Sequence, residues 1–200
     1  MSHTLTQRIL ACRLCENSFH ATRSGHTPRP VAWFHRDARL LIAGQAPGAR
    51  VHASGKPFTD PSGDRLRDWL GLDENAFYEK CKIAIVPMAF CFPGYDAKGA
   101  DLPPPRICAQ TWRAEVMGEL SNIALVLAVG SAAIRWHLGQ SNVTVTVRGW
   151  RDWYEKTGVF PLPHPSWRNT AWLKRNPWFA EELLPDLRRA VASVLEMPDV

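Results

Sequence analysis

The chain has 200 residues, of which 46% are hydrophobic, and a formal net charge of +5. This content suffices for one compact domain with a full core, and no apolar run approaches the length of a membrane-spanning helix. The positive charge is compatible with a polyanionic partner but does not require one. The N-terminal residues are polar and include cysteines, unlike a secretory signal. We therefore expect a cytoplasmic protein with a single domain over residues 1–200.

Four short apolar runs predict buried strands, and the segments between them have helical patterns. The predicted strands are Arg39–Ala43, Lys82–Met88, Ala124–Val129 and Val159–Leu162. The predicted helices are Arg65–Gly71, capped by Ser62 or Asp64, then Pro105–Leu120, Gly130–Leu138 and Asn176–Leu195. Strands that alternate with helices predict an α/β protein, a three-layer α/β/α fold with a central four-stranded, mainly parallel sheet.

A loop rich in small residues follows the first predicted strand. Residues 44–58 read GQAPGARVHASGKPF, with two glycines around a proline and an aromatic ring at the end. Ligands of parallel sheets bind at the carboxyl ends of the strands, and glycines let the backbone come close to a ligand. His164, two residues after the fourth predicted strand, is expected at the same edge of the sheet.

The five cysteines include a CxxC motif, Cys12 and Cys15, and a distant pair, Cys91 and Cys108. In a cytoplasmic protein this pattern indicates metal or redox chemistry before disulfides. Zinc and an iron–sulfur cluster both accept four thiolates. The spacing leaves both open, together with the alternative of free buried cysteines, and Cys81 is left over.

Tryptophans crowd the last third of the chain beside arginine and lysine. Aromatic side chains interleaved with basic ones suit contact with nucleic acid, although about half of these tryptophans are equally expected in the core. The set comprises Trp150, Trp153, Trp167, Trp172 and Trp178.

Two motifs, GQAPG with GKPF at residues 44–58 and HPSWRN at His164–Asn169, resemble the motifs of the uracil-DNA glycosylase superfamily. The similarity is to its family-four enzymes, with some features of family five, and it spans about residues 10–180. The cysteine order resembles that of the ligands of the four-iron four-sulfur cluster in family four. The resemblance implies a structural [4Fe–4S] cluster held by Cys12, Cys15, Cys91 and Cys108.

The resemblance implies a monofunctional DNA repair enzyme that hydrolyses the N-glycosidic bond of uracil in DNA and leaves an abasic site. His164 would donate a hydrogen bond to the departing base. The implied partners are uracil-containing DNA and its abasic product, with no membrane, and the protein is expected to be a monomer. The implied substrate-binding residues are Gly44, Gln45, Ala46, Gly48 and Phe58, and the implied DNA-binding residues are Ser166, Trp167, Arg168 and Asn169.

The residue that orients the attacking water is not fixed by the resemblance, because Gln45 stands where family four has an acid. Asp60 is our first candidate, since family five has an aspartate in a similar stretch that is one residue longer. His52 is the second, because imidazole accepts a proton near neutral pH. Asp60 could instead form a turn or cap a helix, and a cationic sugar would need no strong base.

The amide that reads uracil in family four has no counterpart here, because Pro87 or Met88 stands at the end of the second predicted strand. Proline has no N–H to donate. The alternatives are therefore a glycosylase for other deaminated bases, such as hypoxanthine or xanthine, and a binder of damaged or abasic DNA with weak catalysis.

Overall fold

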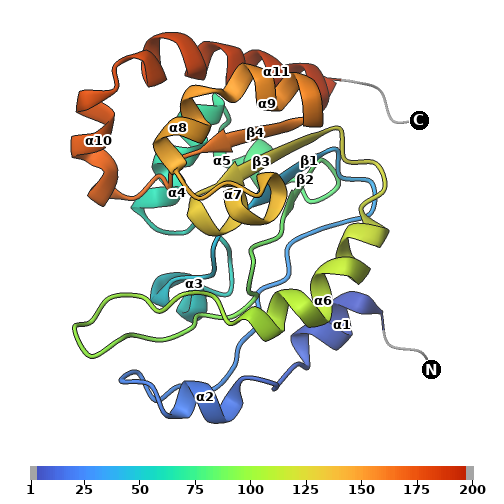
Figure 1. Ribbon diagram of the computed structural model, residues 1–200. Helices are drawn as coiled ribbons and strands as arrows, with labels where there is room; N and C mark the ends of the chain where they lie inside the picture. Colours follow the sequence, from blue (N-terminus) through green and yellow to red (C-terminus); the bar gives the residue numbers. More distant parts are fainter. Residues whose placement is uncertain (1–3, 197–200) are drawn as a thin grey trace.

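The computed structural model describes residues 4–196 and is built around one sheet of four parallel strands (Figure 1). The strand order is β2-β1-β3-β4, and Leu40 of β1 pairs with Ile83 of β2 and Leu125 of β3. The predicted α/β sandwich with a central four-stranded sheet is confirmed. The strands are β1 (Leu40–Ala43), β2 (Ile83–Ile85), β3 (Leu125–Val129) and β4 (Val159–Leu162).

Helices fill the connections between the strands and both ends of the described chain. Those before β2 are α1 (Leu5–Leu10), α2 (Glu16–His20), α3 (Ala49–Ser54), α4 (Pro61–Leu70) and α5 (Glu74–Phe77). Those between β2 and β4 are α6 (Arg106–Glu119), α7 (Ser131–Leu138), α8 (Val143–Arg148) and α9 (Trp150–Thr157). After β4 come the 3-10 turn η1 (Trp167–Asn169), α10 (Thr170–Arg175), the π-helical turn η2 (Phe179–Leu183) and α11 (Leu184–Glu196).

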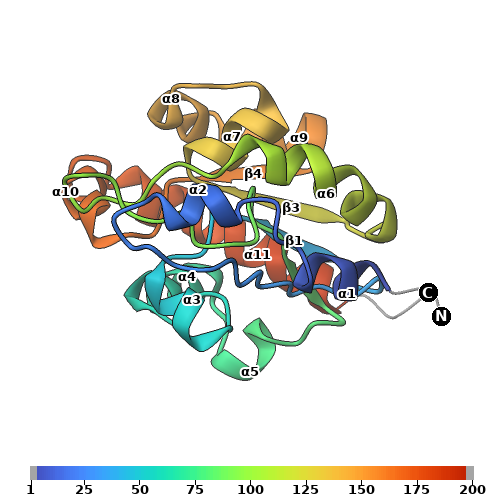
Figure 2. The same cartoon turned by 90° about the horizontal axis from the view of Figure 1, so that it is seen from below.

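The sheet lies between two helical layers (Figure 2). Helices α6 and α7 cover one face, with α1 against α6, and helices α4 and α11 cover the other. All four residues of β1 are fully buried because both faces are covered. Among residues 4–196, none of the helices combines the length and the apolar character that crossing a membrane requires.

Several predicted boundaries were wrong. The second strand ends at Ile85 rather than Met88, and Pro87, which has no N–H, lies in the loop beyond it. Helix α4 begins at Pro61, and its cap is Asp60 rather than Ser62 or Asp64. The Asp60 carboxylate accepts the Gly63 N–H, and a proline in the first helical turn needs no acceptor. Helix α7 begins at Ser131 rather than Gly130, and Gly130 is its N-cap.

The topology creates a switch point at the carboxyl edge of the sheet. The chain leaves β1 toward β2 on one side, whereas it leaves β3 toward β4 on the other. Loops that diverge in this way leave a crevice between them, where ligands of parallel sheets bind.

Candidate active site at the carboxyl ends of the strands

A cleft of about 500 Å³ opens at this switch point. Residues at or just after the carboxyl end of every strand line it, as predicted for the ligand site of a parallel sheet. They include Gly44, Pro87, Val129 and His164. The cleft also contains Gln45, Ala46, Gly48, Phe58 and Asp60, so it gathers the first motif and the histidine motif in one place.

His164 enters the cleft from the loop after β4 as a neutral hydrogen-bond donor. Its Nδ1 accepts the backbone N–H of Ser166 at 3.2 Å, so the ring proton resides on Nε2. Burial lowers the pKa of His164, and the carboxylates of Asp60 and Asp101 oppose this shift. A neutral imidazole with Nε2–H can donate to an oxygen on which negative charge develops.

Phe58 is held in a backbone conformation that is unusual for a large side chain. Its φ of 54° is the only positive φ of a non-glycine residue in the described chain. The Phe58 carbonyl accepts the Tyr78 hydroxyl at 3.1 Å and an Arg67 guanidinium N–H at 3.3 Å. A Cβ on Gly63 would lie 1.8 Å from that carbonyl oxygen, so the turn requires glycine there. Strain fixed by several partners is typical of functional sites.

Asp60 caps a helix and also lines the cleft, so its predicted role toward water stays a prediction. One carboxylate oxygen caps α4 through the Gly63 N–H at 3.2 Å. The residue also lines the cleft, near enough to His164 for its charge to raise the pKa of the imidazole. Nothing in the described part of the chain donates a hydrogen bond to the second oxygen, which is therefore available to water.

Two side-chain hydrogen bonds hold the loop of the HPSWRN motif in place. The Asn169 side-chain amide donates to the His164 carbonyl at 2.7 Å, and Arg65 of α4 donates to the Ser166 carbonyl at 2.9 Å. Ser166 and Arg168 line the cleft with Trp167, whose side chain is 73% exposed. Asn169 does not line the cleft, and its predicted contact with DNA stays a prediction.

The other tryptophans of the last third are not exposed like Trp167. Trp150 is buried and stacks on Trp178, with ring centroids 6.0 Å apart. Trp172 packs edge-on against Trp178. These residues belong to the core and its border, as the alternative interpretation expected.

His52 lies on α3 and is not among the residues that line the cleft. Its ring instead packs edge-on against His26 with centroids 5.1 Å apart. Burial lowers the pKa of His52, and His26 and Arg29 lower it further. The position of His52 therefore gives no support to its predicted role as the base.

The loop of residues 92–102 supplies a wall of the cleft, and its residue Asp101 was not predicted from the sequence. The backbone N–H of Leu102 donates to the Gly94 carbonyl at 2.9 Å, and Tyr95 and Asp101 form a bridge. Gly94 has a φ of 95° and sits on Thr22, where a Cβ would lie 2.6 Å from Oγ1. Tyr95 and Asp101 both line the cleft. The Pro-Gly and Lys-Gly pairs are turn signals, but they do not reveal that a carboxylate faces His164.

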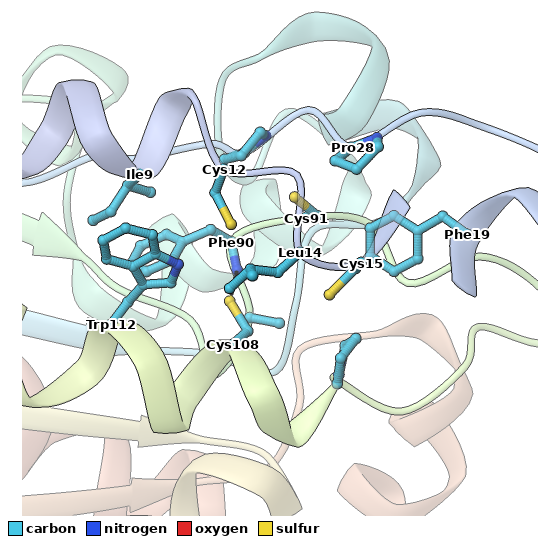
Figure 3. Close-up of a pocket in the computed structure, with 13 residues that line it drawn as sticks. Ile9, Cys12, Leu14, Cys15, Phe19, Pro28, Phe90, Cys91, Cys108 and Trp112 are labelled. Carbon is cyan, nitrogen blue, oxygen red and sulfur yellow. Dashed lines mark hydrogen bonds between the residues drawn. The ribbon is translucent and has the colours of Figure 1, made fainter. Parts of the chain in front are cut away.

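The four predicted ligand cysteines line one apolar pocket (Figure 3). Cys12 and Cys15 come from the segment between α1 and α2, Cys91 follows β2, and Cys108 lies in the first turns of α6. Figure 3 shows the four sulfur atoms around a common space. Burial, reinforced by the neighbouring cysteines, raises the pKa of Cys91 to about 12, and burial raises that of Cys108 to about 11. A bound cation would offset this cost of ionisation.

Four cysteine thiolates are the donor set of an iron–sulfur cluster and also of a structural zinc ion. The donor set fits the implied [4Fe–4S] group, with the Phe90 N–H donating to Cys108 Sγ at 3.4 Å.

Cys81 lies outside this pocket. It is exposed, and its sulfur is within 4.8 Å of ligand atoms of His35 and Asp37, which are also exposed.

The fold and the cleft define the class: a parallel α/β enzyme that presents an aromatic ring, a neutral histidine and carboxylates at its switch point. The family model described as the uracil DNA glycosylase superfamily matches residues 32–188, and the chain belongs to that superfamily. Membership gives the chain a glycosylase-type role in DNA repair, with DNA as its substrate. The matched region contains every residue that lines the cleft except Val31, together with Cys91 and Cys108, whereas the CxxC motif lies before it.

Proposed function

We propose that this protein hydrolyses the N-glycosidic bond between uracil and deoxyribose in DNA and releases the base. The observation that carries the proposal is the neutral His164 in the cleft, with its proton on Nε2. As the bond breaks, negative charge collects on O2 of uracil. A donor at that oxygen contributes roughly 3–4 kcal/mol to stabilisation of the transition state.

Phe58 supplies the stacking surface for the extruded base. Its ring packs edge-on against Phe77, with centroids 6.0 Å apart, so the ring is braced from behind. Its tip also faces Gly44, where a Cβ would lie 3.9 Å from Cζ. A base that has left the duplex can then lie on the ring close to the Gly44 backbone.

Asp60 is the residue that we propose orients the attacking water. Its cap to Gly63 fixes the carboxylate, and its second oxygen has no protein donor in the described region. A fixed carboxylate can hold water by a hydrogen bond and also favours positive charge on the sugar. Asp101 adds a second negative charge near His164.

The exposed edge of the cleft suits the DNA backbone. Trp167 projects from the loop that also carries Arg168, and the Arg168 guanidinium lies 5.9 Å from the indole centroid. An exposed aromatic ring can fill the gap left by a flipped nucleotide. The arginine can bind a phosphate and release counterions.

We further propose that Cys12, Cys15, Cys91 and Cys108 hold a [4Fe–4S] cluster of structural function. Such a cluster would fasten the segment before β1 to both ends of the loop that supplies the 92–102 wall. The four thiols that line one apolar pocket support this assignment.

A second candidate substrate class is the deaminated purines. No side-chain amide stands at the end of β2, where Pro87 lines the cleft. A cleft of about 500 Å³ has room for a base larger than uracil. Hypoxanthine or xanthine could therefore enter the same site.

The test is alkali-induced strand cleavage of oligonucleotides with a single uracil, hypoxanthine or xanthine. We expect the wild type to cut the uracil strand and His164→Ala and Asp60→Asn to fall by about a hundredfold or more. Asp152→Asn, on the exposed face of α9, is the matched control and should keep full activity. Activity only on purines would replace uracil by the second class. Binding to abasic DNA without cutting would make the protein a damage binder.

A further inference from the structure

Arg113 of α6 is the only charged side chain among residues 4–196 that is buried, with 3% of its surface exposed. Its Nη1 donates to the carbonyls of Val86 at 3.3 Å and Pro87 at 3.5 Å. Its Nη2 lies 2.6 Å from His137 Nε2. The guanidinium therefore sits directly behind Pro87, which lines the cleft.

The positive charge of Arg113 has no carboxylate to balance it. No ion pair of this residue occurs within the described chain. Burial lowers the pKa of Arg113 only to about 10, so the group stays charged at neutral pH. Burial and the nearby Arg113 lower the pKa of His137 to about 4. His137 is therefore neutral and accepts the guanidinium N–H.

An unbalanced charge in the interior is costly, and most buried charges are paired. Here the compensation comes only from carbonyl dipoles, a neutral imidazole and the face of Trp136, whose ring centroid lies 5.6 Å from the guanidinium carbon. Arg113 Nε is buried with no hydrogen-bond partner at all in the described structure. A costly charge held behind a reaction site is a candidate for an electrostatic role.

Hydrogen-bonded peptide groups connect Arg113 to the cleft. Arg113 contacts the carbonyl of the Pro87–Met88 peptide, and the N–H of that peptide donates to the Gly44 carbonyl at 2.9 Å. The Gly44 carbonyl shares its peptide with the Gln45 N–H. No acceptor for that N–H is found in the described chain, and Gln45 lines the cleft. A cation at the start of such a series polarises each peptide and strengthens the next donor.

We propose that Arg113 is a positioning residue that makes the Gln45 backbone N–H a stronger donor to the negative charge of the departing base. The proposal rests on the proposed glycosylase function. Arg113 acts through two peptide groups and never touches the substrate.

The experiment compares leaving groups. Single-turnover rates are measured on duplexes with uracil or 5-fluorouracil, a base whose fluorine stabilises the anion, for wild type, Arg113→Met and Arg113→Lys. We expect Arg113→Met to be about tenfold slower on uracil with little change in KM, because the effect passes through two peptides. The loss on 5-fluorouracil should be threefold or less. Arg113→Lys, which keeps the charge, should recover most of the rate.

Equal losses on both bases, or no loss in Arg113→Met, would overturn the proposal and leave Arg113 a structural strut. Circular dichroism and the unfolding midpoint check that each variant is folded. If Arg113→Met does not fold, Arg113→Lys is the deciding variant. If Arg113 acts through its charge, Arg113→Lys should show only a small loss in both rates and the wild-type ratio of the uracil rate to the 5-fluorouracil rate. If Arg113 is only structural, both rates should fall by tenfold or more.

Free base provides a readout that does not need turnover. The ultraviolet spectrum of bound 5-fluorouracil reports its ionisation, and Arg113→Met should raise the apparent pKa of the bound base by about one unit, the same tenfold. A wild type that ionises the bound base but cuts no DNA would refute the proposed function and keep the relay. A wild type that cuts DNA, with no difference between variants in either readout, would refute the relay alone.

Discussion

The cleft and the cysteine pocket lie on either side of the same stretch of chain, residues 86–108, yet they are built in opposite ways. In the cleft, the key polar groups already have partners: His164 Nδ1 accepts from Ser166, and Asp60 accepts from Gly63. In the pocket, four thiols share an apolar enclosure where burial opposes the ionisation of Cys91 and Cys108. The cleft is preorganised by the protein alone, whereas the pocket is the place where we propose a bound cluster.

Loss of a cysteine ligand is the largest effect that this contrast predicts. We expect Cys108→Ser to purify without iron and to lose about 3–5 kcal/mol of stability, roughly 10 °C in the unfolding midpoint for a chain of this size. The physical reason is that the remaining thiols cannot hold the N-terminal segment against α6. Iron and sulfide content, visible absorbance and thermal unfolding measure it.

Cys81→Ser is the matched control, because this exposed thiol lies outside the pocket. It should keep the iron and the unfolding midpoint of the wild type. Iron-free wild-type protein with the same midpoint as Cys108→Ser would show that the pocket is merely four buried thiols.

The next prediction concerns a substitution that should disturb the preorganised cleft. Gly63→Ala places a Cβ against the Phe58 carbonyl, which must move and release the strained turn. We expect a loss of about 1–3 kcal/mol in stability and at least tenfold in the rate of base release, because Phe58 leaves its stacking position. Chemical denaturation and single-turnover kinetics on uracil-containing duplex measure the two losses.

Gly118→Ala separates this effect from that of any added methyl group. Gly118 lies inside α6, and a Cβ there meets nothing within 4 Å. Alanine should stabilise the helix by about 0.5–1 kcal/mol and leave the rate unchanged. If Gly63→Ala behaves like Gly118→Ala, the conformation of Phe58 has no part in catalysis.

The same contrast explains how much could be predicted from the sequence. Apolar runs fixed the strands and the sheet class, because parallel strands are buried on both faces. The cleft motifs lie next to strand ends, so their convergence followed from topology. Asp101 could not be predicted, since the course of its loop depends on how Gly94 packs on Thr22, which lies before β1 and far away in the sequence.

The burial and charge pairing of Arg113 could not be predicted from the sequence either. In the sequence Arg113 is an ordinary residue of an amphipathic helix, and only the packed structure shows that it is buried without a carboxylate. His52 had the right chemistry and the right neighbours in sequence, but α3 turns it toward His26 and away from the cleft lining. The cap of α4 was also mispredicted. Ser62 and Asp64 are both suitable capping residues, and only the local backbone geometry shows that Asp60 is the cap.

The smallest predicted effect concerns the pH dependence of the cleft. His164 acts as a neutral donor, and its pKa is lowered by burial. Activity should therefore be full at neutral pH and fall only as the pH drops through a value below 6.5. The carboxylate of Asp101 raises this pKa, so Asp101→Asn should move the acidic limb of kcat/KM to still lower pH, by less than a unit.

Asp152→Asn, far from the cleft on an exposed helix, should leave the limb where it is in the wild type. A limb that moves to higher pH in Asp101→Asn would have the wrong sign for the loss of a nearby negative charge, and it would assign the titration to a group other than His164. A limb that disappears in His164→Gln, with the remaining slow reaction independent of pH, would place the titration on the imidazole itself. The direction in which the acidic limb shifts in Asp101→Asn thus tests the electrostatics of the cleft more closely than the size of a large loss of activity does.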